Sequence, residues 1–172
     1  MKIRFAIVLV MLVIAPEFAL LGQEPDWLVK MKKIKLLTDS YEDVVTLLGT
    51  PVDGTVEREL SEYFDLPDGR LWVGFASGLC VVTPYSGGAP TGWKVPEWKV
   101  TSVSFRPNRP ISLKKLKLDF SGYVKSPIDD VPGAFIYRND ALGVEYSVTS
   151  RRKIEEIEFF PSTKFAYLQC TG

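Results

Sequence analysis

The 172-residue chain is 46% hydrophobic and 24% charged, which is typical of one globular domain. Lys plus Arg and Asp plus Glu number 21 each, so no net charge attracts nucleic acid or an anionic membrane. Histidine is absent, which excludes Ser-His-Asp and Cys-His catalysis and His-ligated metals. We therefore expect no nucleic-acid partner, no cofactor and no metal site.

The N-terminus is typical of a secretory signal peptide. MKIR carries two positive charges, and residues 5–15 form an apolar run that is too short to span a bilayer as a helix. We favour a signal peptide over residues 1–22, with an uncleaved anchor or a buried helix as alternatives. Ala19 and Gly22 both suit the small-residue position, and we prefer Gly22. Residues 23–172 are then a single secreted or periplasmic domain with no stable membrane span.

The segment 39–51, DSYEDVVTLLGTP, predicts a helix. Asp39 is a suitable N-cap, and Glu42 follows three residues later, where a capping box places its second carboxylate. Gly49 and Pro51 are the residues that commonly end a helix.

Period-two alternation of apolar residues predicts strands after this helix. Residues 70–76 and 99–106 form two of them, and the Asp-Gly turn before Arg70 favours a hairpin with residues 56–64, which also fit a helix. The amphipathic segment 112–120 predicts a second helix. Further strands are expected at residues 134–140, 142–149 and 153–161.

Two segments, KVTSVSFRP (99–107) and KIEEIEFFP (153–161), share a pattern and an irregularity. In each, the first apolar residue, Val100 or Ile154, is out of phase with the later ones, which a β-bulge or an entry turn would explain. Similar strands arising by coincidence are the alternative to a repeat.

We interpret the pattern as a duplication. The predicted fold class is α+β: a tandem duplication of an α-β-β-β unit, with an antiparallel sheet and helices packed on one face. Repeat one covers about 38–107 and repeat two about 111–161.

The helix segment DSYEDVVTLLGTP resembles that of the SmpA/OmlA (BamE-type) envelope proteins, where a capped helix ending in leucine-leucine-glycine-x-proline precedes an antiparallel sheet. BamE-type proteins are lipid-anchored through a cysteine after the signal, and this chain has none there. A tandem duplication of such a unit resembles the β-lactamase inhibitor protein, whose two repeats build one curved sheet. The chain is also similar to uncharacterised secreted bacterial proteins with a GWxVP phrase and paired cysteines.

Cys80 and Cys170 are the two cysteines of the chain. Cysteines of an exported protein most often pair, so we predict a Cys80–Cys170 disulfide, with two separate buried thiols as the alternative. The bridge would close a loop of about 90 residues and contribute about 4–5 kcal/mol.

Carboxylates are the catalytic groups that remain in the absence of histidine. Asp129 and Asp130 form the clearest pair, but SPIDDVPG is flanked by Pro and Gly and predicts a turn. A catalytic or cation-binding role is the alternative. We assign no catalytic residue; Asp129, Asp130 and Glu145 are the groups to neutralise if any hydrolysis is detected.

The long segment 76–98 has only residues 149–152 as its counterpart in the second repeat. Loops this long are usually functional or disordered, and Tyr85, Trp93, Trp98 and Cys80 argue against disorder. Trp72 on the preceding strand would extend the same patch. We predict that Trp72, Tyr85, Trp93 and Trp98 form the partner-binding surface; the alternative is that these aromatics fix the loop onto the sheet.

These observations predict a non-enzymatic, exported or envelope-associated protein that recognises a protein or glycan through its aromatic Gly/Pro-rich loop. A secreted hydrolase that uses carboxylates is one alternative. A structural envelope protein without a ligand is another.

Overall fold

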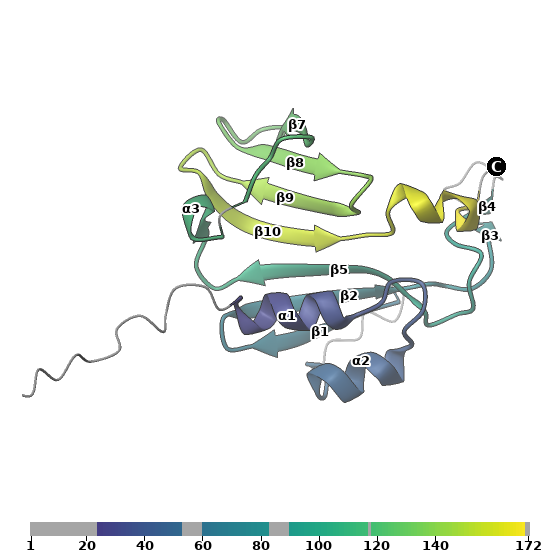
Figure 1. The fold of residues 1–172 in the computed structure, drawn as a ribbon. Helices are drawn as coiled ribbons and strands as arrows, with labels where there is room; N and C mark the ends of the chain where they lie inside the picture. The colour runs from purple at the N-terminus through teal and green to yellow at the C-terminus, as the bar shows by residue number, and fades with distance from the viewer. Residues whose placement is uncertain (1–23, 53–59, 83–89, 117, 171–172) are drawn as a thin grey trace, which may run out of the picture.

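An eight-stranded antiparallel sheet dominates the structure, a computed structural model that describes residues 24–52, 60–82, 90–116 and 118–170 (Figure 1). Seven strands follow the order β1-β2-β5-β10-β9-β8-β7, and β6 pairs with β10. The strands are β1 (Ser61–Leu66), β2 (Gly69–Phe75), β5 (Val100–Pro107), β6 (Ile111–Ser112), β7 (Val124–Pro127), β8 (Phe135–Asn139), β9 (Val144–Val148) and β10 (Lys153–Phe159). A separate ribbon pairs β3 (Val81–Val82) with β4 (Pro90–Thr91).

The helices are short. They are α1 (Asp26–Lys33), α2 (Tyr41–Leu48), α3 (Leu113–Leu116) and the 3-10 helix η3 (Thr163–Leu168). None of the helices in the described ranges is long and apolar enough to cross a membrane. The predicted signal peptide, residues 1–22, lies outside those ranges.

The predicted fold class is wrong. We expected an α+β fold built as a tandem duplication of an α-β-β-β unit, with helices packed on one face of the sheet. The described chain is instead mostly antiparallel sheet with a few short helices. Helices α1 and α2 have eight residues each, whereas α3 has four. The predicted second repeat contains five described sheet strands, β6 to β10, where three were expected.

The second helix was predicted over 112–120, and two interactions explain why only Leu113–Leu116 is helical. The start of the segment is used by β6, which pairs with the first residues of β10. Beyond Leu113–Leu116, the Asp119 carboxylate accepts hydrogen bonds from the Ser121 backbone N–H (2.9 Å) and hydroxyl (2.7 Å). Such a turn competes with helical hydrogen bonding. Amphipathic spacing alone therefore overestimated the helix.

The first predicted helix is confirmed as α2, with a different N-cap. Ser40 rather than Asp39 caps it: the Ser40 Oγ accepts a hydrogen bond from the Asp43 N–H (3.3 Å), and the Asp43 carboxylate accepts one from the Ser40 N–H (2.8 Å). Gly49 ends the helix with φ of 94°, a conformation that favours glycine.

The predicted hairpin and both predicted bulges are present. Strands β1 and β2 form the hairpin. The register of β5 against β2 skips Thr101, and that of β10 against β9 skips Glu155. Each bulge lets the preceding apolar residue face inward, so Val100 and Ile154 are both fully buried (0% exposed).

The main hydrophobic core lies on one face of the sheet. Leu71 and Val73 of β2 point into it, and α1 contributes Trp27 and Met31. The Trp27 ring stacks on Phe105 of β5 with a centroid distance of 4.3 Å. Full burial of one such side chain contributes about 1.5–3 kcal/mol, so α1 is held mainly by this contact with the sheet.

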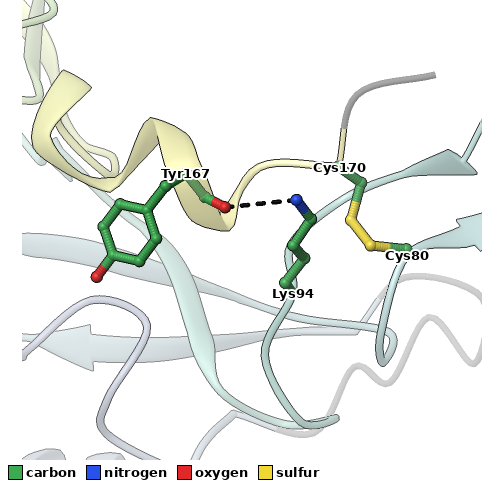
Figure 2. The surroundings of a disulfide bond; sticks show 4 residues. All are labelled: Cys80, Lys94, Tyr167 and Cys170. Atoms are coloured by element: carbon green, nitrogen blue, oxygen red, sulfur yellow. Dashed lines mark hydrogen bonds between the residues drawn. A yellow bond between two sulfur atoms is a disulfide. The ribbon is translucent and has the colours of Figure 1, made fainter.

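A disulfide joins the C-terminal segment to the long segment between β2 and β5, as predicted. Cys80 and Cys170 are bonded with an S–S distance of 2.12 Å and a Cα–Cα distance of 5.5 Å. The Lys94 N–H donates to the Leu168 carbonyl (2.6 Å). Figure 2 shows the Lys94 ammonium donating to the Tyr167 carbonyl (3.4 Å) beside the bridge. In Figure 1, η3 accordingly lies next to β3 and β4.

Candidate functional site

The residues predicted to bind a partner lie in different surroundings, and Tyr85 lies outside the described residues. Trp72 alternates along β2 with Leu71 and Val73, which are both fully buried (0% exposed). Because successive side chains of a strand point to opposite faces, the Trp72 ring lies on the sheet face opposite the core.

Trp98 and Trp93 lie away from Trp72. The Trp98 ring is 5.8 Å from Tyr41 of α2 and 5.9 Å from Phe75, a core-face residue of β2, and Trp98 is 41% exposed. Trp93 is partly buried in a small cluster with Val95. The contacts of Trp93 agree with the alternative that loop aromatics fix the segment onto the sheet. The structure therefore does not bring the three tryptophans onto one surface.

The face opposite the core carries a row of mostly polar side chains that crosses seven strands in register. Taken from β1 to β7, the row is Tyr63, Trp72, Ser104, Glu158, Glu145, Arg138 and Val124. The helical residues of the main hydrophobic cluster pack with core-face residues such as Leu71 and Phe105. We call the surface around this row the open face, and we take it as the candidate functional site.

A hollow of about 930 Å³ lies over the β1-β2-β5 end of the open face. Its aromatic walls are Tyr63, which is 38% exposed, and the half-buried Trp72. Arg70 forms an ion pair with Asp65 (Nε to Oδ1, 2.7 Å), and its guanidinium carbon lies 6.0 Å from the centre of the Tyr63 ring. This pairing fixes a planar donor group at the edge of an aromatic surface.

A glycine outside the lining of the hollow leaves space for the Trp72 ring. Gly74 follows on the same strand, on the same face as Trp72, and is buried. A Cβ atom at Gly74 would stand 3.2 Å from the Trp72 Cη2 atom and 2.7 Å from the Ser102 Oγ atom. The far edge of the indole therefore lies beside Gly74, in space that a larger side chain would occupy.

The opposite wall of the hollow is an ion pair between two central strands. Arg106 of β5 donates to Glu156 of β10 (3.0 Å), and the Ser104 hydroxyl donates to the other oxygen of the same carboxylate (2.5 Å). With both oxygens engaged, the Glu156 carboxylate is held in one orientation.

Two further carboxylates continue the row beyond the hollow. Glu158 of β10 faces Glu145 of β9. Burial raises the pKa of the Glu158 carboxyl, and the neighbouring charges of Glu145 and Glu156 raise it further, while Arg138 opposes them. Arg138 donates to Glu145 (3.2 Å) and pairs with Asp140 (2.7 Å). Glu158 therefore holds a proton more readily than an exposed glutamate does.

The acidic pair Asp129 and Asp130 lies elsewhere. Both side chains are exposed and form part of a turn after β7, as the Pro/Gly flanks predict. Asp130 has φ of 61°, the left-handed conformation that Asp tolerates in turns.

Sequence analysis missed most of the open face. Tyr63, Arg70, Arg106 and Glu156 were not selected, because each is an ordinary outward position of its own strand. The period-two pattern of each strand identifies such outward positions. Only the strand order tells which of them become neighbours.

No protein-family model matches this chain, and no curated protein matches it in sequence. Among solved structures it is similar to a DUF4309 family protein (YjgB) from Bacillus subtilis subsp. subtilis str. 168. The TM-score is 0.48 and the identity 8%, over 77% of this chain and 85% of that one. This likeness supports no statement about function. The resemblance to SmpA/OmlA proteins stays a prediction.

Proposed function

We propose that this chain is an exported, non-enzymatic binding protein and that its open face binds a glycan of the cell envelope or the medium. The observation that carries the proposal is the hollow of about 930 Å³, in which Trp72 and Tyr63 stand among paired charged groups. Its volume is within the range of roughly 300–1,000 Å³ that is typical of sites for compact ligands.

The chemistry of the lining favours a sugar. Aromatic rings stack on the apolar C–H face of a pyranose, while its hydroxyl groups need fixed planar donors and acceptors around them. Arg70, Arg106 and Glu156 provide such groups, already oriented by their own hydrogen bonds. Preorganised groups lose little conformational entropy when a ligand binds.

A protein partner is the competing class of ligand. Trp, Tyr and Arg are also the residues that dominate protein interfaces. A protein interface, however, centres on a desolvated apolar core, and the hollow on the open face is lined mainly by charged and polar side chains. We therefore place the glycan first and treat the protein as an outcome of the test.

Export is the second part of the proposal. It rests on the charged start and apolar run of residues 1–15 and on the Cys80–Cys170 disulfide, a bond that persists in oxidising compartments. Mass measurement of the exported chain tests it: we expect a mature N-terminus at Gln23. Recovery of only the uncleaved chain, in the membrane fraction, would contradict the proposal.

The binding test uses the oxidised mature chain. The probes are insoluble peptidoglycan and soluble polysaccharide from the producing cells, followed by an array of defined bacterial glycans and calorimetry. Trp72→Ala should weaken glycan binding by about tenfold or more, as expected for an aromatic residue at the centre of a site. Trp98→Ala is the matched control, because this exposed indole contacts Tyr41 and Phe75 on the other side of the sheet.

The outcomes separate the ligand classes. Loss of binding in Trp72→Ala with an unchanged melting temperature, and retention in Trp98→Ala, supports the proposal. If no glycan binds, while a protein from the medium is captured by wild type and not by Trp72→Ala, then the open face is a protein interface. Equal losses in both variants would place the site elsewhere.

A carboxylate hydrolase is the second candidate, and the raised pKa of Glu158 beside Glu145 favours it. Glycoside hydrolysis uses two carboxyl groups, one of them protonated. The test is release of reducing sugar from the same polysaccharides by wild type, Glu158→Gln and Glu145→Gln. Turnover that both variants abolish would make the protein an enzyme; binding without turnover excludes this candidate for those substrates.

A further inference from the structure

A second hollow, of about 540 Å³, opens on the core side of the sheet, away from the open face. Helix α1 and the segment that follows it form one wall, and the end of β10 with the start of η3 forms the other. The walls are largely apolar, with Met31, Ile34, Val103, Phe159, Phe160 and Phe165 among them. A hollow of this size and lining suits an apolar ligand.

The mouth of this hollow is apolar on one side. Leu142, from the corner between β8 and β9, lines it and is 66% exposed. A leucine so far exposed at the entrance of an apolar hollow is in position to be covered when a ligand is present.

The charged lining residues are all of one sign. Lys32, Lys35 and Lys164 line the hollow, and none of its lining residues in the described ranges is Asp or Glu. Lys32 is paired with Glu24. The Lys164 ammonium lies 4.8 Å from the centre of the Phe165 ring and forms no ion pair within the described part of the chain. Lys164 is therefore available to an anionic group.

Ser162, two residues before Lys164, also lines the hollow and carries a buried hydroxyl. Ser162 is 7% exposed, and its Oγ atom has no hydrogen-bond partner in the described structure. It occupies the N-cap position of η3, where a serine side chain usually accepts a backbone hydrogen bond, and makes none. A buried hydroxyl without a partner is unfavourable, so an acceptor that reached the Ser162 hydroxyl would supply the hydrogen bond that it lacks.

Close packing against Gly143 and backbone hydrogen bonds fix the position of the chain around Ser162. Gly143 faces it with φ of 68°, and a Cβ atom there would lie 2.1 Å from the Phe160 carbonyl and 2.9 Å from the Ser162 nitrogen. The Phe160 N–H donates to the Gly143 carbonyl (3.0 Å), and the Thr163 N–H donates to the Asp140 carbonyl (2.9 Å). The position of Ser162 is thus set by the fold on both sides.

We propose that this hollow binds a fatty acid. Its acyl chain would lie between α1 and β10, and its carboxylate would accept hydrogen bonds from the Ser162 hydroxyl and the Lys164 ammonium. The apolar wall selects the chain. Lys35 and Lys164 form no ion pair within the described residues, so their charges select an acidic head over a neutral or cationic one. This site is separate from the glycan proposal and stands without it.

The test uses the oxidised mature chain and three probes with the same tail: dodecanoate, dodecanol and dodecyltrimethylammonium. Calorimetry and native mass spectrometry below the micelle concentrations should give one dodecanoate per chain. We expect dodecanoate to bind about tenfold or more tightly than either other probe, because only its head accepts charge-assisted hydrogen bonds.

Two conservative variants locate the head group. Ser162→Ala and Lys164→Gln should each weaken dodecanoate binding severalfold, and together about tenfold or more, with little change for dodecanol. Lys125→Gln is the control, since this lysine of β7 lies over the Phe135 ring of β8 and does not line the hollow. Melting temperatures confirm folding, and Lys164 is exposed, so at least that variant should remain folded.

Several outcomes would overturn the inference. They are the absence of saturable dodecanoate binding, equal binding of the cationic probe, and an unchanged dodecanoate affinity in the folded double variant. Binding to vesicles of anionic phospholipid without binding of monomeric dodecanoate would also overturn it, because it would make the lysines a membrane-contacting patch.

Discussion

Cys170, close to the C-terminus, is bonded to Cys80, at the start of the ribbon formed by β3 and β4. The Cys170 N–H also donates to the Gly92 carbonyl (3.0 Å), so the C-terminal segment is joined to the residues flanking both strands at one end of that ribbon. The long segment between β2 and β5 is therefore part of the folded structure at its described ends.

Reduction of this disulfide should destabilise the protein. A bridge between residues 90 apart removes much loop-closure entropy from the unfolded chain, which corresponds to about 4–5 kcal/mol. We expect Cys80→Ala/Cys170→Ala to unfold at lower urea concentration and to melt several degrees lower. The native protein should show no alkylatable thiol; two reactive thiols before reduction would contradict the bond.

Gly74 should be required for the position of the Trp72 ring on the open face. In Gly74→Val the new side chain would meet the Trp72 ring and Ser102, so the indole must move. We expect a loss of about 1–3 kcal/mol of unfolding free energy from overpacking, together with weaker glycan binding. Gly78→Val is the control, because nothing lies within 4 Å of a Cβ there, although its φ of 113° brings backbone strain. Glycan binding that survives Gly74→Val unchanged would show that the position of Trp72 is unimportant.

The carboxyl group of Glu158 should make stability depend on pH. Its pKa is raised in the folded state by burial first and then by Glu145 and Glu156. The folded state therefore holds this proton more tightly than the unfolded state, and stability falls as the pH rises from the unfolded pKa through the folded one.

Glu158→Gln removes this titration. We expect the variant to be more stable than wild type at neutral pH, with the difference shrinking as the pH falls below both pKa values. Urea unfolding from pH 3 to pH 8 measures it, with Glu155→Gln, an exposed neighbour in the bulge, as the control. If wild type were instead more stable than Glu158→Gln, and increasingly so as the pH rises, the raised pKa of Glu158 in the folded state would be refuted.

The N-cap of α2 should be Ser40. Ser40→Ala loses the hydrogen bond from the Asp43 N–H and leaves the Asp43 carboxylate with one partner fewer. The expected cost is about 1 kcal/mol, measured by chemical unfolding. Ser77→Ala, at an exposed loop serine, is the matched control and should lie within about 0.5 kcal/mol of wild type. Equal effects of both substitutions would mean that the cap contributes nothing.

Local sequence patterns predicted the features that depend on near neighbours in the chain. Alternation identified β2, β5, β9 and β10, and the Asp-Gly turn identified the β1-β2 hairpin. The phase slip at Val100 and Ile154 predicted both bulges. The strands and bulges are identified by side chains that alternate every two residues, which the backbone geometry of a strand imposes directly, and the hairpin by the residues that its turn favours.

The tertiary structure alone decided which outward positions meet. Trp72 and Trp98 are separated because the former points away from the core and the latter packs against Phe75 on the core side. Glu158 lies between Ser104 and Glu145 because β10 is inserted between β5 and β9. The segment 112–120 did not become a full helix because Ser112, at its start, belongs to strand β6 and pairs with Lys153 of β10. These outcomes depend on pairings between distant segments, whose free energy a local pattern does not contain.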